Sequence, residues 1–435
     1  MEKFATTAFI IAVAHLVLGL LLWFRVRKLY SYPGLLGFPV FGNLYYFYRT
    51  LFLVTMDSME KYMIRISETY GKDGLCFHWI YGFRTLVTVT NPHIVKEIGF
   101  HPNVTHKPNF IFSAFHSYFS GPFVSSRSDD LWKIQRKEYD TFLKKSRVES
   151  EHSNTFSKYA DQMIELMLAS PSADILRAVT LEFTHNSTME TLFGVDSSIV
   201  YNPQVIGFMS VIPVLGTLSV ANPKLAGTIF GIFKKMESFF LRTIEKTRRL
   251  ILEDIYSKIL TSSPVAANKK ALLSRQITSR MRKCNEDEDK LINELMELFV
   301  TSSGTTHALL SSSLIFLALL PDIQERAWQE QYEIFDNDKR DATFDDLSQM
   351  RFLDRFIKEA LRFVAPPFYF KSVTGDTTIR MHYTTTLMKV ALSKIIRRLK
   401  LRPVQKDFRF EDIQFETFIM RELANPPVLQ VEQRE

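Results

Sequence analysis

A run of seven small or polar residues, Thr301 to His307, interrupts the most apolar segment of the chain. This segment, Leu291 to Leu320, is apolar nearly all round and predicts a buried helix. Polar groups in a buried helix need either hydrogen-bond partners or a ligand. The structural alternative is that Ser and Thr hydroxyls bond to carbonyls one turn earlier, while Gly304 permits a close packing contact.

Two shorter motifs place pairs of side chains on one helix face. Trp132 and Arg136 are four residues apart, and an indole N–H with a guanidinium can hold a carboxylate. The alternative is a half-buried Trp beneath an Arg. Glu359 and Arg362 are three apart and are expected to form an ion pair. A second Glu-x-x-Arg, at Glu245, is expected to be an ordinary exposed pair.

The chain has only two cysteines in 435 residues, Cys76 and Cys284. Two cysteines in a chain of this length do not make a disulfide framework, so a reducing compartment is expected. Each is expected to be an ordinary thiol, because neither is followed two residues later by the glycine that would let a backbone approach its sulfur.

Hydrophobic periodicity predicts a mainly α fold with a minor β-sheet. Residues 75–90 are expected to form a hairpin about Gly82, Met350–Pro367 a helix that ends at Pro366-Pro367, and Tyr383–Leu399 another helix. The C-terminal segment alternates around a turn at 425–427, which predicts a strand pair.

The N-terminus predicts a membrane anchor. Residues 4–24 carry no charge and would span about 31 Å as a helix, and Arg25, Arg27 and Lys28 follow at once. The positive-inside rule then leaves the rest of the chain in the cytosol. The alternative, a cleaved signal peptide, lacks a small-x-small cleavage site. Residues 25–43 form a basic, proline-rich hinge, and 44–435 is expected to be one domain.

The basic residues behind the net charge of +7 are scattered along the chain, which favours anionic lipid or acidic proteins over nucleic acid as partners.

The order of these motifs resembles the cytochrome P-450 family of haem-thiolate monooxygenases, of the microsomal kind. The anchor, the hinge, W-x-x-x-R, the long helix with GTT and KEALRFVAPP follow in the family's order. The resemblance implies a membrane-anchored enzyme of the endoplasmic reticulum that inserts one atom of O2 into a lipophilic small molecule. It also implies haem as the cofactor and an NADPH-dependent flavoprotein reductase as a partner.

The resemblance also assigns roles to individual residues. Trp132 and Arg136 would face a haem propionate, and Lys371 stands near the place of a propionate-binding arginine. Thr305, with Thr306 beside it, would steer protons to iron-bound dioxygen. Glu359 and Arg362 would be the core ion pair that braces the haem-proximal side.

The chain departs from the family pattern at two places. Gly304 stands where the family has an acidic residue and Ser302 where it has glycine, so proton delivery is expected to be impaired or rerouted. Between Ile379 and Met381 the family has a meander and the loop that carries the axial cysteine, and this chain has neither. His382 lies near this junction but is a poor substitute, because histidine ligation gives different chemistry.

The sequence therefore leaves three interpretations. The first is a haem-dependent monooxygenase. The second is a non-catalytic, membrane-anchored remnant that binds apolar ligands or a partner, or that fails to fold. The third is an incomplete gene model or transcript of an active enzyme. For the chain as written we expect no axial thiolate, doubtful haem retention and little monooxygenase activity.

Overall fold

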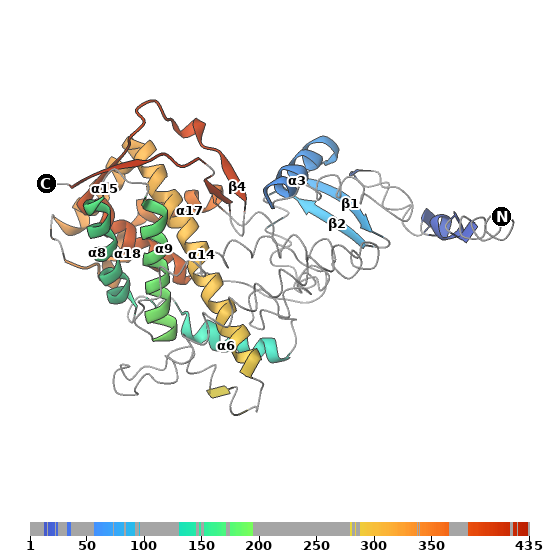
Figure 1. The fold of residues 1–435 in the computed structure, drawn as a ribbon, viewed down its shortest axis with the longest axis horizontal. Helices are drawn as coiled ribbons and strands as arrows, with labels where there is room; N and C mark the ends of the chain where they lie inside the picture. Colours follow the sequence, from blue (N-terminus) through green and yellow to red (C-terminus); the bar gives the residue numbers. More distant parts are fainter. Residues whose placement is uncertain are drawn as a thin grey trace. The chain divides into compact units, whose positions relative to one another are not determined.

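The fold is described by a computed structural model (Figure 1). It describes residues 13–14, 16–21, 23–24, 33–35, 56–72, 74–81, 84–91, 95, 130–144, 148, 152–170, 175–194, 279–280, 283, 288–336, 338, 340–364, 382–417, 421–423 and 425–433. The chain divides into two compact units, which are Met1–His106 with Lys371–Thr378, and Lys107–Phe370 with Ile379–Glu435. This division cuts across the single domain expected over 44–435, which stays a prediction.

The smaller unit contains helix α3 (Met56–Tyr70) and the antiparallel strands β1 (Leu75–Tyr81) and β2 (Arg84–Val89). The predicted hairpin is confirmed. Gly34 forms a parallel bridge with Phe77, and a Cβ at Gly34 would lie 2.1 Å from the Phe77 carbonyl oxygen. Only glycine therefore fits at this position without a backbone shift.

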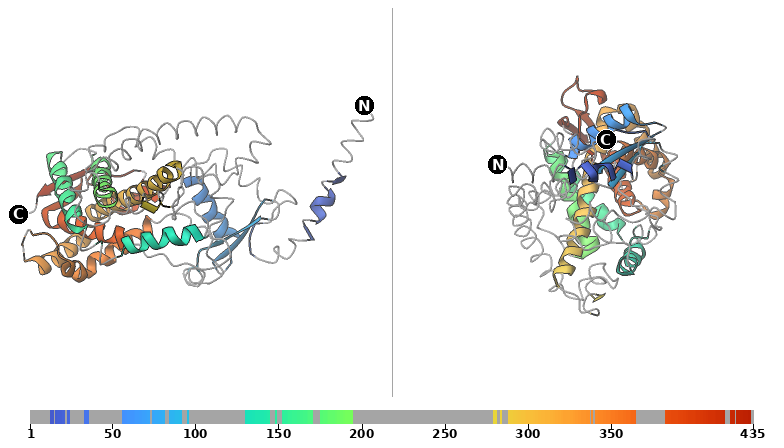
Figure 2. Two further views of the ribbon diagram at one scale, coloured as in Figure 1. Left: turned by 90° about the horizontal axis from the view of Figure 1, so that it is seen from below. Right: turned by 90° about the vertical axis from the view of Figure 1, so that its right-hand side faces the viewer.

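The larger unit is mainly helical, as predicted. Its helices are α6 (Asp130–Phe142), α8 (Ser153–Ala169), α9 (Leu176–Thr188), the π-helix η3 (Met189–Phe193), α14 (Glu288–Leu319), α15 (Pro321–Phe335), α16 (Phe344–Gln349), α17 (Arg351–Phe363), α18 (His382–Arg398) and the short η4 (Phe410–Asp412). α14 contacts α9, α15, α17 and α18, and α8 packs against α9 and α18 (Figure 2). α14 is thus the central element of the unit's core.

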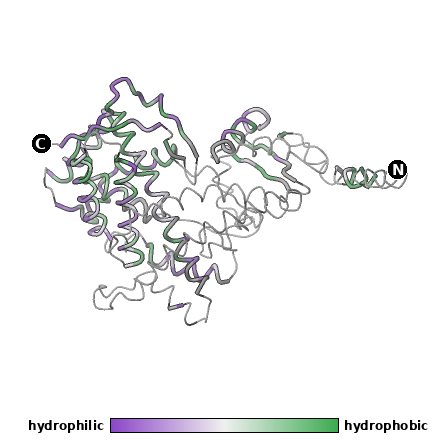
Figure 3. The backbone as a smooth tube through the Cα atoms, viewed as in Figure 1, coloured by the Kyte–Doolittle hydropathy of each residue, from purple (hydrophilic) through white to green (hydrophobic). Residues whose placement is uncertain are grey.

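The limits of the central helices follow from their sequences. α14 spans 32 residues and ends before Leu320, whose φ of −121° and ψ of 74° are not helical. Pro321 then begins α15, a position where its missing N–H costs nothing. α15 ends at Asp336, whose φ of 46° lies in the left-handed region that Asp tolerates. Hydrophobic and hydrophilic stretches both occur along the helices of this unit (Figure 3), as its mixture of buried and exposed residues requires.

The C-terminal strands pair differently from the prediction. β4 (Phe415–Thr417) pairs with β5 (Arg421–Leu423), and β6 (Leu429–Gln433) pairs with β3 (Leu399–Pro403), both antiparallel. The strands on either side of 425–427 are therefore not each other's partners. The alternating pattern identified strands, but a partner about thirty residues away leaves no local signal.

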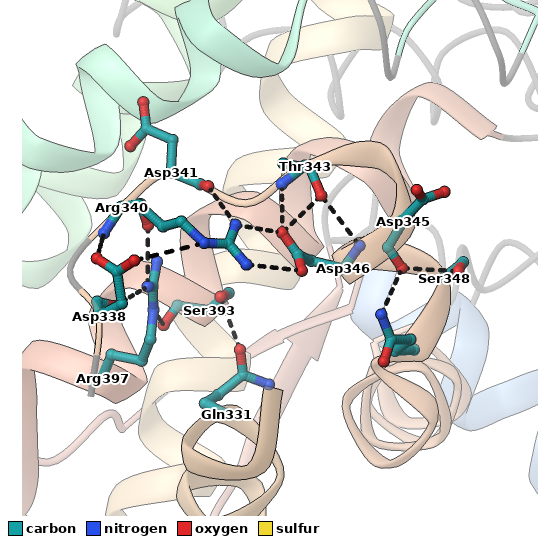
Figure 4. A network of polar contacts seen from close by, with 11 residues as sticks. Gln331, Asp338, Arg340, Asp341, Thr343, Asp345, Asp346, Ser348, Ser393 and Arg397 are labelled. Carbon is teal, nitrogen blue, oxygen red and sulfur yellow. Dashed lines mark hydrogen bonds and ion pairs between the residues drawn. The ribbon is translucent and has the colours of Figure 1, made fainter. Parts of the chain in front are cut away.

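A polar network holds α15, α16 and the second half of α18 together (Figure 4). Arg340 reaches both carboxylate oxygens of Asp346, at 2.5 and 3.0 Å. The guanidiniums of Arg340 and Arg397 lie 4.9 and 3.9 Å from the centre of the Phe335 ring. The Ser393 hydroxyl of α18 donates to the Gln331 side chain of α15 at 2.7 Å. The C-terminal half of α18 is therefore fixed by several independent contacts.

Among the described residues, no helix is by itself long and apolar enough to cross a membrane. One pair, Asn293–Leu319 with Pro321–Phe335, passes that test together by length and composition, with a bend of 107° between its halves. Of the anchor predicted over 4–24, the structure describes ten residues between 13 and 24, which are helical. The anchor itself stays a prediction.

Candidate functional site

Most hydroxyls in the polar run of α14 donate to carbonyls of the same helix. Ser303, Thr305 and Thr306 each donate to the carbonyl four residues earlier, all at 2.8 Å. The hydroxyl part of the structural alternative is thus confirmed, and the close packing contact expected at Gly304 stays a prediction. Ser303 and Thr306 are fully buried and Thr305 is half-buried. With its proton committed to the helix, the Thr305 hydroxyl offers a ligand only its lone pairs.

Two buried histidines, His307 of α14 and His185 of α9, lie between these two helices. His307 Nδ1 lies 3.0 Å from the Thr180 hydroxyl. The Thr180 hydroxyl also lies 2.7 Å from a carbonyl oxygen of its own helix, and donation to that carbonyl favours the tautomer with the hydrogen on Nδ1. His185 stacks on Phe299 with 5.0 Å between ring centres. Burial lowers the pKa of His307 to about 3 and that of His185 to about 4, so both are neutral at pH 7.

Helix α6 carries Trp132 half-buried and Arg136 buried, with 8% of Arg136 exposed. The Arg136 guanidinium pairs with the Asp140 carboxylate, one turn further along α6, at 2.8 Å. The helix itself and the four-residue spacing are as predicted. Asp140 is a mainly exposed carboxylate on the same helix, so this pair leaves the proposed propionate-binding role untested.

A buried carboxyl joins α6 to α14, and sequence reasoning missed it. Glu294 of α14 is 1% exposed and accepts hydrogen bonds from Gln135 Nε2 and the Tyr139 hydroxyl, both at 3.1 Å. Arg280 pairs with Glu294 as well and reaches Glu138 of α6 at 3.0 Å. Eleven residues separate Glu294 from Thr305, about 16 Å along the helix. The available signal was a pair of glutamates, 294 and 297, inside an otherwise apolar stretch.

The Glu359–Arg362 pair forms as predicted but on the surface of α17. Arg362 Nη2 and Nε reach the two carboxylate oxygens of Glu359 at 2.7 and 3.0 Å. Whether the pair braces the haem-proximal side stays a prediction, but its two side chains are 58% and 64% exposed. The physical reason is that Leu353, Ile357 and Ala360 occupy the buried face of the helix. The hydrogen bonds from Arg362 lower the pKa of Glu359.

Comparison with known proteins identifies the family. The cytochrome P450 family model matches residues 33–385. The chain belongs to the cytochrome P450 family. By family it is therefore a monooxygenase, and the family's cofactor is haem.

Individual P450 proteins resemble the chain over most of its length. Probable cytochrome P450 313a3 of Drosophila melanogaster is 24% identical, over 95% of this chain and 96% of that protein. Cytochrome P450 3A29 of Sus scrofa is also 24% identical, over 82% of this chain and 71% of the relative. A crystal structure of a cytochrome P450, CYP102L1, superposes with a TM-score of 0.70 at 15% identity, over 93% of this chain and 99% of that one. This last likeness establishes the P450 fold.

The described residues do not fit a haem-thiolate centre. Cys76 is buried in the hairpin of the smaller unit, and its Sγ lies 3.8 Å from the Ile66 carbonyl oxygen. Burial raises the pKa of this thiol, which favours the protonated form that does not bind iron. Among the residues that the structure describes, no three His, Cys, Asp or Glu side chains gather in a way that could hold a metal ion.

Three further candidates cannot be placed. Cys284 and Lys371 lie outside the described residues, and so does the junction between Ile379 and Met381. His382 begins α18, but its side chain is not among those described. The roles that the P450 resemblance gives these positions stay predictions.

Proposed function

We propose that this chain is a P450 scaffold for oxidising lipophilic small molecules that lacks its own axial sulfur and, as written, does not catalyse monooxygenation. One observation carries this proposal. The last cysteine is Cys284, which precedes α14, so the whole segment after α17 contains no thiol. Iron held by a thiolate needs a deprotonated cysteine at a fixed place, and no residue after 284 can supply one.

Two further observations support a lost segment rather than a relocated ligand. The alignment with cytochrome P450 313a3 runs over 498 positions, which exceeds the 435 residues of this chain, so part of the relative has no counterpart here. In addition, the Glu359–Arg362 pair is exposed, although the family resemblance places it in the core. A missing meander and cysteine loop account for both observations.

The test is a carbon-monoxide difference spectrum of the purified, reduced full-length chain after incubation with haem. Cys76→Ser and Cys284→Ser serve as matched variants. We expect no thiolate-type band in any of the three proteins. A thiolate-type band in the wild type that disappears in one serine variant would refute the proposal and identify the ligand.

A different measurement distinguishes a non-catalytic remnant from an incomplete gene model. Reading the genomic and messenger sequences across Ile379 and Arg380 distinguishes a true remnant from an incomplete transcript. A remnant has the same junction in its messenger, whereas an active gene encodes the missing segment there. Binding of apolar ligands by the haem-free protein would favour a remnant with a binding role, and the absence of such binding would count against that role.

We further propose that the chain resides in the endoplasmic reticulum membrane through residues 4–24, with its body in the cytosol. The uncharged 21-residue stretch and the basic residues after it support this location. Fusing a fluorescent reporter to the wild type and to a variant that lacks residues 1–24 tests it. The deletion should abolish carbonate-resistant membrane association, and unchanged association would contradict the anchor.

A further inference from the structure

The Glu294 carboxyl is a junction at which three segments of the larger unit meet. Its donors are Gln135 and Tyr139 of α6 and the guanidinium of Arg280. Glu294 belongs to α14, so the carboxyl links α6 to the central helix. Gln135 and Tyr139 are four residues apart and lie on one face of α6. A change in the charge or shape of the Glu294 side chain therefore affects how α6 packs against α14.

At this junction a single guanidinium contacts two carboxyl groups. Arg280 is shared between Glu294 and Glu138, so one guanidinium faces two carboxylates. Glu297, one turn further along α14, is fully buried. Burial raises the pKa of Glu294 to about 7, although Arg280 and the hydrogen bonds from Tyr139 and Gln135 favour the ionised form. The proton on Glu294 is thus exchanged near neutral pH.

We propose that Glu294 is a pH-sensitive positioning residue, whose proton sets how firmly α6 is held against α14. In the neutral state Arg280 is free to pair fully with Glu138. In the ionised state Arg280 divides its charge between two carboxylates in a water-poor site, which weakens the local structure. α6 carries Trp132 and Arg136, so the residues that the P450 resemblance assigns to cofactor binding move with it.

Tyr139 and the two buried histidines each keep one charge state over the pH range of the effect. Tyr139 keeps its proton, because burial and the charges of Glu294 and Glu297 raise its pKa well above the ordinary value. His185 of α9, which packs along α14, and His307 of α14, which contacts Thr180 of α9, are both neutral at pH 7.

Hydrogen–deuterium exchange of the full-length protein at pH 5.5 and 7.5 tests the proposal without haem or activity. After correction for intrinsic exchange, protection of the α6 amides should fall by about 20-fold as the pH rises. This follows when local opening returns Glu294 from a pKa of about 7 to its ordinary 4.5. The sign follows from the raised pKa, since the closed state binds the extra proton and its advantage is lost between pH 4.5 and 7.

Glu294→Gln should remove this fall, because an amide keeps the shape and does not titrate. Glu190→Gln is the matched control. Glu190 also accepts from a lysine and a tyrosine, Lys158 at 2.8 Å and Tyr159 at 2.7 Å. Burial acts to raise the pKa of Glu190, but these hydrogen bonds lower it overall. In Glu190→Gln, protection of the α6 amides should therefore still fall as the pH rises, as it does in the wild type. No fall in the wild type, or an equal fall in Glu294→Gln, overturns the proposal.

Tyr139→Phe provides a second arm if Glu294→Gln does not fold. This variant removes a donor that stabilises ionised Glu294, so the upper inflection of α6 protection against pH should move up by roughly half to one unit. An inflection that stays where it is in the wild type would show that α6 does not respond to the Glu294 proton.

Discussion

Replacing His307 by Gln is expected to protect the protein from mild acid. In the wild type the imidazole is buried, donates to the Thr180 hydroxyl and has a pKa lowered to about 3. The unfolded chain binds a proton at a pKa of about 6.5. The folded state therefore binds fewer protons, and its stability falls as the pH drops below 6.5 toward 3. Glutamine keeps an amide donor for Thr180 and does not titrate.

The magnitude follows from linkage between protonation and folding. At pH 5, a histidine with a folded pKa of about 3 costs about 2 kcal/mol of unfolding free energy relative to pH 7.5. His185, with a pKa of about 4, costs about 2 kcal/mol more. Glu294 opposes both, because its raised pKa adds about 2 kcal/mol at the lower pH. The variant should therefore lose about 2 kcal/mol less than the wild type between pH 7.5 and 5.

Urea unfolding at the two pH values, followed by far-ultraviolet circular dichroism, measures this difference. Comparing the variant with the wild type cancels the contributions of Glu294 and of the other shared groups that do not interact with His307. If His307→Gln loses as much stability between pH 7.5 and 5 as the wild type does, the reasoning from buried neutral imidazole is refuted.

Three further changes test other contacts by urea unfolding. Gln324→Ala should cost about 3 kcal/mol, because this buried amide bonds the N–H and the carbonyl of Leu401 at 3.1 and 3.0 Å. Gln329→Ala, on the exposed face of the same helix, should cost almost nothing, and similar losses for both would contradict this account. Thr343→Ala removes the capping box of α16 and should cost about 1 kcal/mol, while an unchanged midpoint would mean that the cap is dispensable. Arg362→Ala should leave the midpoint unchanged, because both side chains of its pair are mainly exposed, and a clear loss would show that the pair is covered in solution.

The helices of the larger unit were predictable because each carries local signals. Pro321 marked the boundary between α14 and α15, and the apolar spacing of 352–364 gave α17 within a few residues. The partner of β6 was not predictable. β3 and β6 are joined only after the chain passes through β4 and β5, and alternation along one strand does not name its neighbour.

The contacts of the candidate site likewise fall into those that local spacing predicts and those that it does not. Spacing of three or four along one helix correctly predicted the contact between Glu359 and Arg362, but it said nothing of their exposure, which depends on what covers the helix. The Glu294 junction could not be found by spacing, because Gln135 is 159 positions away from it in the chain. Contacts of this kind depend on how α6 and α14 pack, and a single sequence does not encode that in any short pattern.

The attachment of α18 has a practical consequence for protein engineering. Its described polar contacts with neighbouring helices begin at Lys389, which pairs with Asp354 of α17 at 3.1 Å. They continue with Ser393, Lys394 and Arg397, and Lys394 pairs with Asp161 of α8 at 2.6 Å. A loop bearing a cysteine could therefore be grafted in front of His382 without unseating the helix that follows. Under the proposed function, the chain is a host in which an iron-binding loop can be rebuilt one residue at a time, with haem uptake as the measure of success.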